Sequence, residues 1–268
     1  MSIADKLQDL ITAKEDIKTA IQNKGVTVDG GLTTYADAIS KIPNNEGDVE
    51  VAIKWYDGWK LSCSTFTEAP MLDTTGVTDL SQLFNICREL QTVPLYDTSN
   101  VKDMKMMFYN CGNLQSVPLF DTTNVTDMMS MFAYCTSLET IPQFDTTNVK
   151  YMSDMFEGCT NLKTVPLLNT PNVYRGADIF SNCPNLENIG GLHDLGKDRL
   201  FTYIEFDGCP KITTESVSNI FNHLYDRSNK EEFYYNASIA LPTSVLQNIP
   251  EYIITIAIKK GWQVVGIH

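Results

Sequence analysis

The sequence repeats itself with a period of 24 residues, and this period constrains the fold more than any other feature. Within each copy a Phe, a Cys and a Leu recur at fixed positions, such as Phe132, Cys135 and Leu138 in the third copy. The five successive copies, which we call coil 1 to coil 5, span residues 73–96, 97–120, 121–144, 145–168 and 169–192. A fixed period of this length is typical of a solenoid, in which each copy packs on its neighbours. The chain is therefore predicted to form an extended repeat protein.

Each copy contains two different hydrophobic patterns. A short segment rich in Thr, Val and Ile, such as the one that leads to Ile141, predicts a strand. The strand is expected to end at the following proline, because proline cannot donate to a sheet ladder. Turn residues follow, and then Val149, Met152 and Met155 are spaced as one face of a short helix. Each copy is therefore predicted to be a strand, a turn and a helix in an α/β repeat with right-handed connections.

The segments before and after the coils divide the chain into four predicted parts. These parts are an N-terminal helical module for anchoring or oligomerisation (1–43), a linker (44–48), the solenoid with an N-terminal hairpin cap (49–212) and a C-terminal cap of helices and strands (213–268). Caps are expected because an uncapped solenoid exposes its core and its strand edges.

A heptad pattern marks the predicted N-terminal module. Its spacings of three and four residues place apolar side chains on one seam of a helix, interrupted by Lys14. The apolar residues of this seam are Ile3, Leu7, Leu10, Ile17 and Ile21. The seam predicts a homo-oligomer or docking on another protein, and the alternative is a small hairpin that packs on its own chain.

Charge and hydrophobicity restrict the partners of the chain. The formal net charge is −13, and no basic stripe interrupts it, which argues against binding to nucleic acid or to anionic membranes. No apolar run reaches the roughly 18 residues that a membrane-spanning helix needs, so we expect no membrane insertion. The first residues lack a basic segment followed by an apolar one, so we expect synthesis in a cytoplasm without a secretory signal.

Seven cysteines follow the register of the repeat. They are Cys63, Cys87, Cys111, Cys135, Cys159, Cys183 and Cys209. Their odd number and shared register predict a buried column of reduced thiols, because free Cys behaves as a small buried hydrophobe. None lies close to another in the C-x-x-C manner of a zinc or redox site.

No arrangement of residues in the sequence indicates an active site. His193, His223 and His268 are not placed with Cys or carboxylates at metal-ligand spacing. No phosphate-binding loop or nucleophile motif occurs. We therefore expect no enzyme activity, no cofactor and no metal.

Two columns of aspartates leave one alternative open. The first column contains Asp73, Asp97, Asp121 and Asp145, and the second contains Asp79, Asp103 and Asp127. Stacked carboxylates can bind calcium through their oxygens. Aspartates in turns more often accept backbone N–H hydrogen bonds, and this is the role that we expect.

An aromatic column is the candidate binding strip. Strict alternation along the strand places Tyr96, Phe120 and Phe144 outward, beside the hydroxyl residues Thr92, Ser116 and Thr140. Such a strip suits a sugar or a protein edge. The alternative is that these rings belong to the core.

The repeats resemble the BspA-like leucine-rich repeat family. The family pattern F-D-T-S-N-V-T-x-M-x-x-M-F-x-x-C-x-x-L reads FDTTNVTDMMSMFAYCTSL at residues 120–138, and the resemblance covers roughly residues 60 to 212. The strand segment departs from the family pattern, because VPLF or IPQF is two residues shorter than the usual L-D-L-S-N-F. The resemblance implies a leucine-rich-repeat-like solenoid, and it implies that the Phe before each Asp points inward at a bend.

Both ends of the chain also carry a resemblance. The segment CPKITTESVSNIFNHLYD looks like the end of such proteins in gut bacteria and their phages, and ITAKEDIKTAIQNKGVTV is similar to short modules of bacteriophage tail and virion proteins. These likenesses imply a non-enzymatic virion component of the tail or head fibre type. Its implied partners are other virion proteins and a host surface glycan or protein.

Two alternatives to a virion component stay open. One is a bacterial surface adhesin with leucine-rich repeats. The other is a polysaccharide depolymerase, which would need a pair of carboxylates at one singular position. The repeating aspartate columns offer no such pair.

Overall fold

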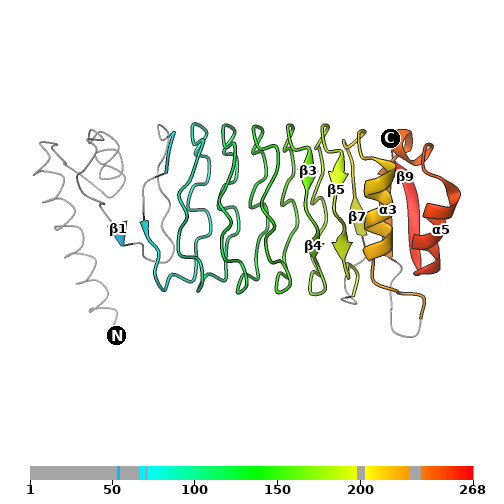
Figure 1. Ribbon diagram of the computed structural model, residues 1–268, viewed down its shortest axis with the longest axis horizontal. Coiled ribbons are helices and arrows are strands. Elements are labelled where there is room, and N and C mark those ends of the chain that lie inside the picture. The colour runs from blue at the N-terminus through cyan, green and yellow to red at the C-terminus, as the bar shows by residue number, and fades with distance from the viewer. Residues whose placement is uncertain (1–52, 55–66, 70–71, 198–202, 230–236, 268) are drawn as a thin grey trace, which may run out of the picture.

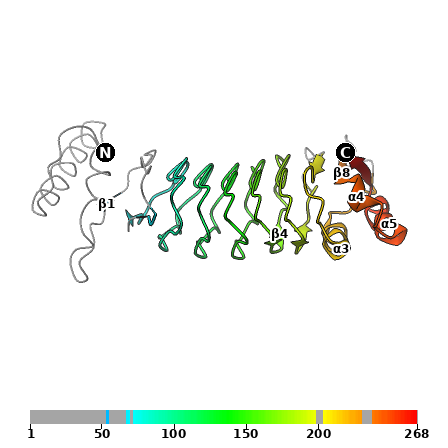
Figure 2. The ribbon, with the colours of Figure 1, turned by 90° about the horizontal axis from the view of Figure 1, so that it is seen from above.

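The coils stack side by side into one elongated body. The computed structural model describes residues 53–54, 67–69, 72–197, 203–229 and 237–267. In this part of the chain the coils follow one another along the long axis, and the C-terminal cap closes one end (Figure 1). The view from above shows the same row (Figure 2). The predicted repeat solenoid is therefore confirmed, whereas the N-terminal module and its seam from Ile3 to Ile21 lie outside the described residues.

The strands are short and all pair in parallel. The strands before and within the coils are β1 (Ile53–Lys54), β2 (Leu72–Asp73), β3 (Thr164–Val165), β4 (Leu168–Asn169), β5 (Asn188–Ile189) and β6 (Leu192–His193). β1 pairs with β2, β3 with β5, and β4 with β6. β3 ends directly before Pro166, as expected from the missing N–H group of proline.

The predicted helix of each coil is wrong. All of coils 2 to 5 is described, and these coils contain turns in place of helices. In coil 2 some backbone N–H groups bond to the next coil and others bond within their own coil. Met104 donates to Asp127 O of the next coil at 2.9 Å, whereas Met107 donates to Met104 O at 3.1 Å. Successive four-residue turns, each closed by an N–H bonded to the carbonyl three residues before it, also place apolar residues three and four apart, so they reproduce the spacing that predicted a helix.

Left-handed backbone makes these turns possible. Coil 2 has φ of 54° at Met106 and 58° at Asn110, and the same two positions are left-handed in the other coils. A left-handed conformation costs about 1–2 kcal/mol for a residue with a side chain. The hydrogen bonds to the next coil offset this cost, because they satisfy N–H groups that would otherwise be buried without a partner.

The core consists of columns of equivalent side chains. The Phe rings of successive coils are stacked, with 5.6 Å between the centroids of Phe108 and Phe132 and 5.7 Å between those of Phe132 and Phe156. A Thr column lies beside them, and Thr122 Oγ1 donates to Asp145 O of the next coil at 2.8 Å. The core is therefore continuous along the solenoid, and each coil is completed by its neighbours.

The Cys column supplies hydrogen bonds as well as volume. The thiol of Cys135 donates to Phe108 O of the preceding coil at 3.1 Å, and Cys159 does the same to Phe132 O at 3.0 Å. Burial raises the pKa of the Cys159 thiol to about 12. Cys111, Cys135, Cys159, Cys183 and Cys209 are free and buried. Cys87 is disulfide-bonded, so the prediction of a fully reduced column is wrong at this residue.

The C-terminal cap contains the helices of the described chain and its longer strands. The elements of the cap are β7 (Tyr203–Glu205), α3 (Thr214–His223), β8 (Ala237–Pro242), α4 (Thr243–Leu246), α5 (Glu251–Lys259) and β9 (Trp262–Ile267). The strands form a parallel sheet in the order β7-β8-β9. Thr213 begins α3 by accepting the Ser216 N–H, and Gly261 at φ 81° connects α5 to β9. Helices and strands therefore follow the last coil in the described chain.

Candidate interaction face

The aromatic binding strip predicted from the sequence is wrong. The exposed fractions of Tyr96, Phe120 and Phe144 are 2%, 2% and 0%. Their rings form a second stacked column in the core, with 6.4 Å between the centroids of Phe120 and Phe144. The inward alternative implied by the family resemblance is correct. Thr92, Ser116 and Thr140, the hydroxyl residues of the same strip, are exposed.

A tight bend explains why alternation fails at these rings. The Phe120 N–H donates to Pro118 O at 3.0 Å, which closes a three-residue turn around Leu119. The bend directs the Phe120 ring back toward Phe108, at a centroid distance of 6.3 Å. Leu119 is left outside, with 60% of its side chain exposed. The outward apolar residue is therefore the Leu before the ring.

Coils 1 and 2 carry an uncharged surface at this bend. Leu95 and Leu119 are 62% and 60% exposed, and both follow a proline. The other exposed residues of segments 91–95 and 115–119 bear amides and hydroxyls and no charge, whereas the exposed Glu68 pairs with Thr92 at the border of this surface. This surface, which we call the neutral patch, consists of the exposed residues Gln91, Thr92, Leu95, Gln115, Ser116 and Leu119. The backbones of the two coils are joined here, since Gln115 N–H donates to Gln91 O at 3.1 Å.

The same face becomes charged in the later coils. In coils 3 and 4, Lys163 Nζ lies 2.9 Å from Glu139 Oε2. Thr164 Oγ1 donates to Thr140 Oγ1 at 3.0 Å, and Gln143 Nε2 donates to Leu167 O at 2.5 Å. These polar side chains bond to one another across the coils, and the most exposed large apolar side chains on this face are Leu95 and Leu119 of coils 1 and 2.

A group of acids and tyrosines lies on another side of the solenoid. Tyr134 donates its hydroxyl to Glu157 Oε1 at 2.6 Å. Partial burial, followed by the charges of Glu157 and Asp178, raises the pKa of Asp154 to about 6. Glu205 also has a raised pKa, first because of its hydrogen bond with Asp178. A cluster of like negative charges creates a potential that attracts cations. Among the described residues, however, no group of three or more acids, His or Cys is arranged to hold a metal ion.

The two aspartate columns take the role expected of turn residues. Asp103 Oδ1 accepts the Lys105 N–H at 2.8 Å, and Asp127 Oδ1 accepts the Met129 N–H at 2.9 Å. In the other column, Asp121 accepts the Thr123 N–H at 3.0 Å, and this bond lowers the pKa of the Asp121 carboxyl. The carboxylates therefore hold the loops of the coils, and this role requires no bound ion.

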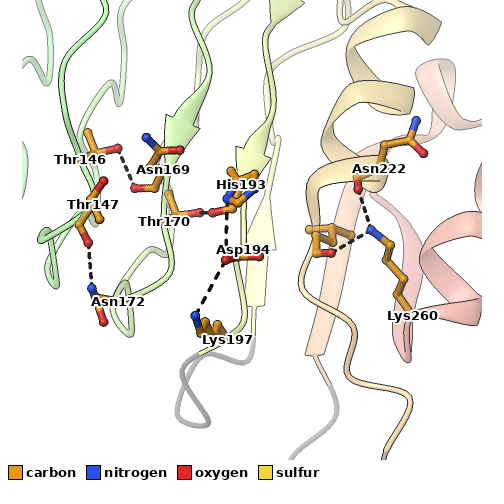
Figure 3. A network of polar contacts seen from close by, with 11 residues as sticks. Thr146, Thr147, Asn169, Thr170, Asn172, His193, Asp194, Lys197, Asn222 and Lys260 are labelled. Carbon is orange, nitrogen blue, oxygen red and sulfur yellow. Dashed lines mark hydrogen bonds and ion pairs between the residues drawn. The ribbon is translucent and has the colours of Figure 1, made fainter.

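His193 in β6 lies where the last coil meets the cap (Figure 3), and His223 is the last residue of α3. The rings of His193 and His223 have a centroid distance of 5.9 Å. Asp194 lies 3.7 Å from His193 Nδ1 and 3.9 Å from Lys197 Nζ. His223 Nδ1 is 2.7 Å from Asn219 O, so its ring bonds to its own helix. These contacts join the end of coil 5 to α3, and the Asp194 N–H also donates to His223 O at 2.8 Å.

Comparison with known families gives two matches. Residues 65–191 match a family described as a Mycoplasma protein of unknown function, DUF285. Residues 131–252 match a family described as BspA type Leucine rich repeat region (6 copies). No curated protein matches the chain. The chain is thus similar to BspA-type leucine-rich repeats, which are generally not enzymes, over the region that forms the later coils and part of the cap.

The family matches support one expectation from the sequence, the leucine-rich repeat, and do not test the expected partners. They support the leucine-rich repeat and give no link to a bacteriophage, a tail or a fibre. No helix among the described residues is long and apolar enough to cross a bilayer. The host-surface partner and the homo-oligomer through the N-terminal seam stay predictions.

Proposed function

We propose that this protein is a non-enzymatic recognition scaffold that binds a partner protein over the neutral patch. The observation that carries this proposal is the pair Leu95 and Leu119, which are more than half exposed on adjacent coils of a rigid surface. An interface core is depleted of charge and enriched in apolar contact. The chain has a net charge of −13, but the neutral patch carries no charge and exposes two leucines. Its composition is therefore that of an interface core.

The partner surface is expected to be apolar and uncharged at its centre. The leucines of neighbouring coils lie about 4.8 Å apart if they follow the strand spacing, so one partner side chain can contact both. Thr92 and Ser116 offer hydroxyls beside the leucines and can hydrogen-bond to the partner backbone. The virion location and the host-surface partner implied by the resemblance are finer proposals that rest on that resemblance alone.

Site-specific photo-crosslinking tests the proposal. A photoreactive amino acid replaces Leu119 in the full chain, and in a second protein it replaces Lys150, an exposed residue of coil 4. We expect a defined protein to be crosslinked from position 119 and not from position 150, and mass spectrometry identifies it. The same species crosslinked equally from both positions, or from position 150 alone, would contradict the proposal.

A further inference from the structure

The cap ends in a strand whose outer edge pairs with no other strand of the described chain. β9 is the last strand in the order β7-β8-β9, and it pairs with β8 on one side only. Proteins commonly protect such an edge with Lys, Pro or a bulge. The six residues of β9, Trp262–Ile267, contain neither Lys nor Pro, and their pairing with β8 is continuous. The edge is therefore competent to pair with another strand.

Helix α5 lies at the same end of the molecule and exposes apolar side chains. In both views α5 and β9 are together at the end of the described row opposite coil 1 (Figure 1 and Figure 2). Tyr252 is 70% exposed and Ile258 is 57% exposed. Both belong to the outer side of α5, since the inner side is formed by the buried Ile253 and Ala257.

The outer side of α5 is complementary to a second copy of itself. Counted from Thr255, Tyr252 is three residues before and Ile258 three residues after, while Glu251 is four before and Lys259 four after. In an antiparallel pair of these helices centred on Thr255, Tyr252 meets Ile258 of the second copy. In the same pair, Glu251 meets Lys259 of the second copy. Apolar groups thus meet apolar groups, and opposite charges meet.

We propose that two copies of the chain associate end to end through this cap, around a twofold axis that pairs β9 with β9 and α5 with α5. A twofold axis makes the two β9 strands antiparallel and extends the three-stranded sheets into one sheet. The interface is isologous, so each contact occurs twice. The occupant of the surface is therefore a second copy of this chain. This inference does not depend on the neutral patch or on its partner.

The mass of the full chain in solution tests the proposal. Light scattering coupled to size exclusion is expected to show an assembly built from pairs of the 30.1-kDa chain. The substitution Ile258→Glu is expected to halve that mass, because it places two acids in the apolar part of the interface. Leu119→Glu makes the same kind of change on the side of coil 2, and is expected to leave the mass unchanged.

A charge exchange distinguishes dissociation from misfolding. Glu251→Lys alone places like charges opposite each other and is expected to weaken the pair at least about tenfold. The double variant Glu251→Lys/Lys259→Glu restores opposite charges and is expected to restore the mass. A wild-type chain that is monomeric at every concentration, or an assembly unaffected by Ile258→Glu and Glu251→Lys, would overturn the proposal.

Discussion

The coils and the cap satisfy their buried polar groups in different ways. In the coils, a group bonds to the equivalent region of the next coil, as Thr146 Oγ1 does to Asn169 O at 2.7 Å (Figure 3). In the cap, each bond is individual: Lys260 Nζ donates to Leu224 O at 2.9 Å, and Trp262 Nε1 donates to Tyr225 O at 3.0 Å. The coils thus depend on the regular period, whereas the cap depends on single contacts that have no equivalent elsewhere.

This difference separates the roles of the two regions. Because the coils bury their aromatic, thiol and hydroxyl columns completely, the outward positions are free to vary from coil to coil without disturbing the core. The neutral patch and the ion pair of Glu139 with Lys163 occupy equivalent faces and differ in charge. The residues of the cap instead cover the end of the core. Arg227 is 97% buried there, and its Nη1 donates to Gly196 O at 3.2 Å.

The largest effect is expected where the columns of the coils are interrupted. Phe132→Ala removes a ring that stacks between Phe108 and Phe156 and leaves a cavity in the continuous core. The free energy of unfolding is expected to fall by about 3–5 kcal/mol, measured by chemical denaturation. Leu119→Ala, at a 60% exposed position outside the left-handed residues, is the control and is expected to change stability little. A similar loss for both variants would contradict the role of the stacked column.

A single position in the cap is expected to give the next largest effect. Gly261 has φ 81°, and a Cβ there would lie 2.6 Å from the backbone of Arg227, which cannot move without breaking the cap. Gly261→Ala is therefore expected to cost about 3 kcal/mol or more in thermal or denaturant unfolding. Gly76 has φ 76° but nothing within 4 Å of its Cβ position, so Gly76→Ala is expected to cost only about 1–2 kcal/mol. Equal costs would show that the close approach to Arg227 is unimportant.

The Thr column allows a test within the coils themselves. Thr122 Oγ1 donates to Asp145 O, whereas Thr98 Oγ1 is buried and has no hydrogen-bond partner. Thr122→Val is expected to cost about 1 kcal/mol, because it leaves a buried carbonyl with one bond fewer. Thr98→Val is expected to be neutral or stabilising, because it removes a buried hydroxyl without a bond. Equal effects in denaturant unfolding would mean that coils 2 and 3 are equivalent here.

The smallest effect concerns the acids on the side of the solenoid. The pKa of Asp154 is raised to about 6 in the folded protein, so its contribution to stability is fully present below pH 3.8 and is lost as pH rises through 6. Asp154→Asn is therefore expected to stabilise the protein at pH 7 by less than about 1 kcal/mol, since solvent screens this half-exposed group. The gain is expected to disappear near pH 3.5, and a gain that is independent of pH would contradict this cause.

The 24-residue period predicted the stacked solenoid, but it did not predict the backbone conformation within each coil. The described members of the Phe, Cys and Leu columns lie in the core, as their register indicates. The helices were wrongly predicted because Met106 and Asn110 adopt left-handed φ, and methionine gives no signal of that conformation. Bonds to the next coil help to stabilise it, such as the Met106 N–H to Met129 O at 2.9 Å, and such bonds are not visible in a single copy.

The strip predicted from the sequence and the neutral patch share Thr92 and Ser116 but differ in their large apolar side chains. Thr92 and Ser116 are exposed as expected, but alternation was continued through the proline to Tyr96 and Phe120. The proline before Leu95 and Leu119 was the signal for a bend, and it could have identified these leucines as the outward residues. The uncharged composition of residues 91–95 and 115–119 was also visible in the sequence.

The affinity of the crosslinked partner for patch variants tests the central claim most directly. The purified partner is titrated by calorimetry with the full chain, with Leu95→Glu/Leu119→Glu, and with Ile86→Glu, a like change on another side of coil 1. The neutral patch predicts that the double variant weakens binding at least about a hundredfold, since acids are buried in the interface centre, and that Ile86→Glu binds as the wild type does. An unchanged affinity of the double variant would contradict recognition through the neutral patch.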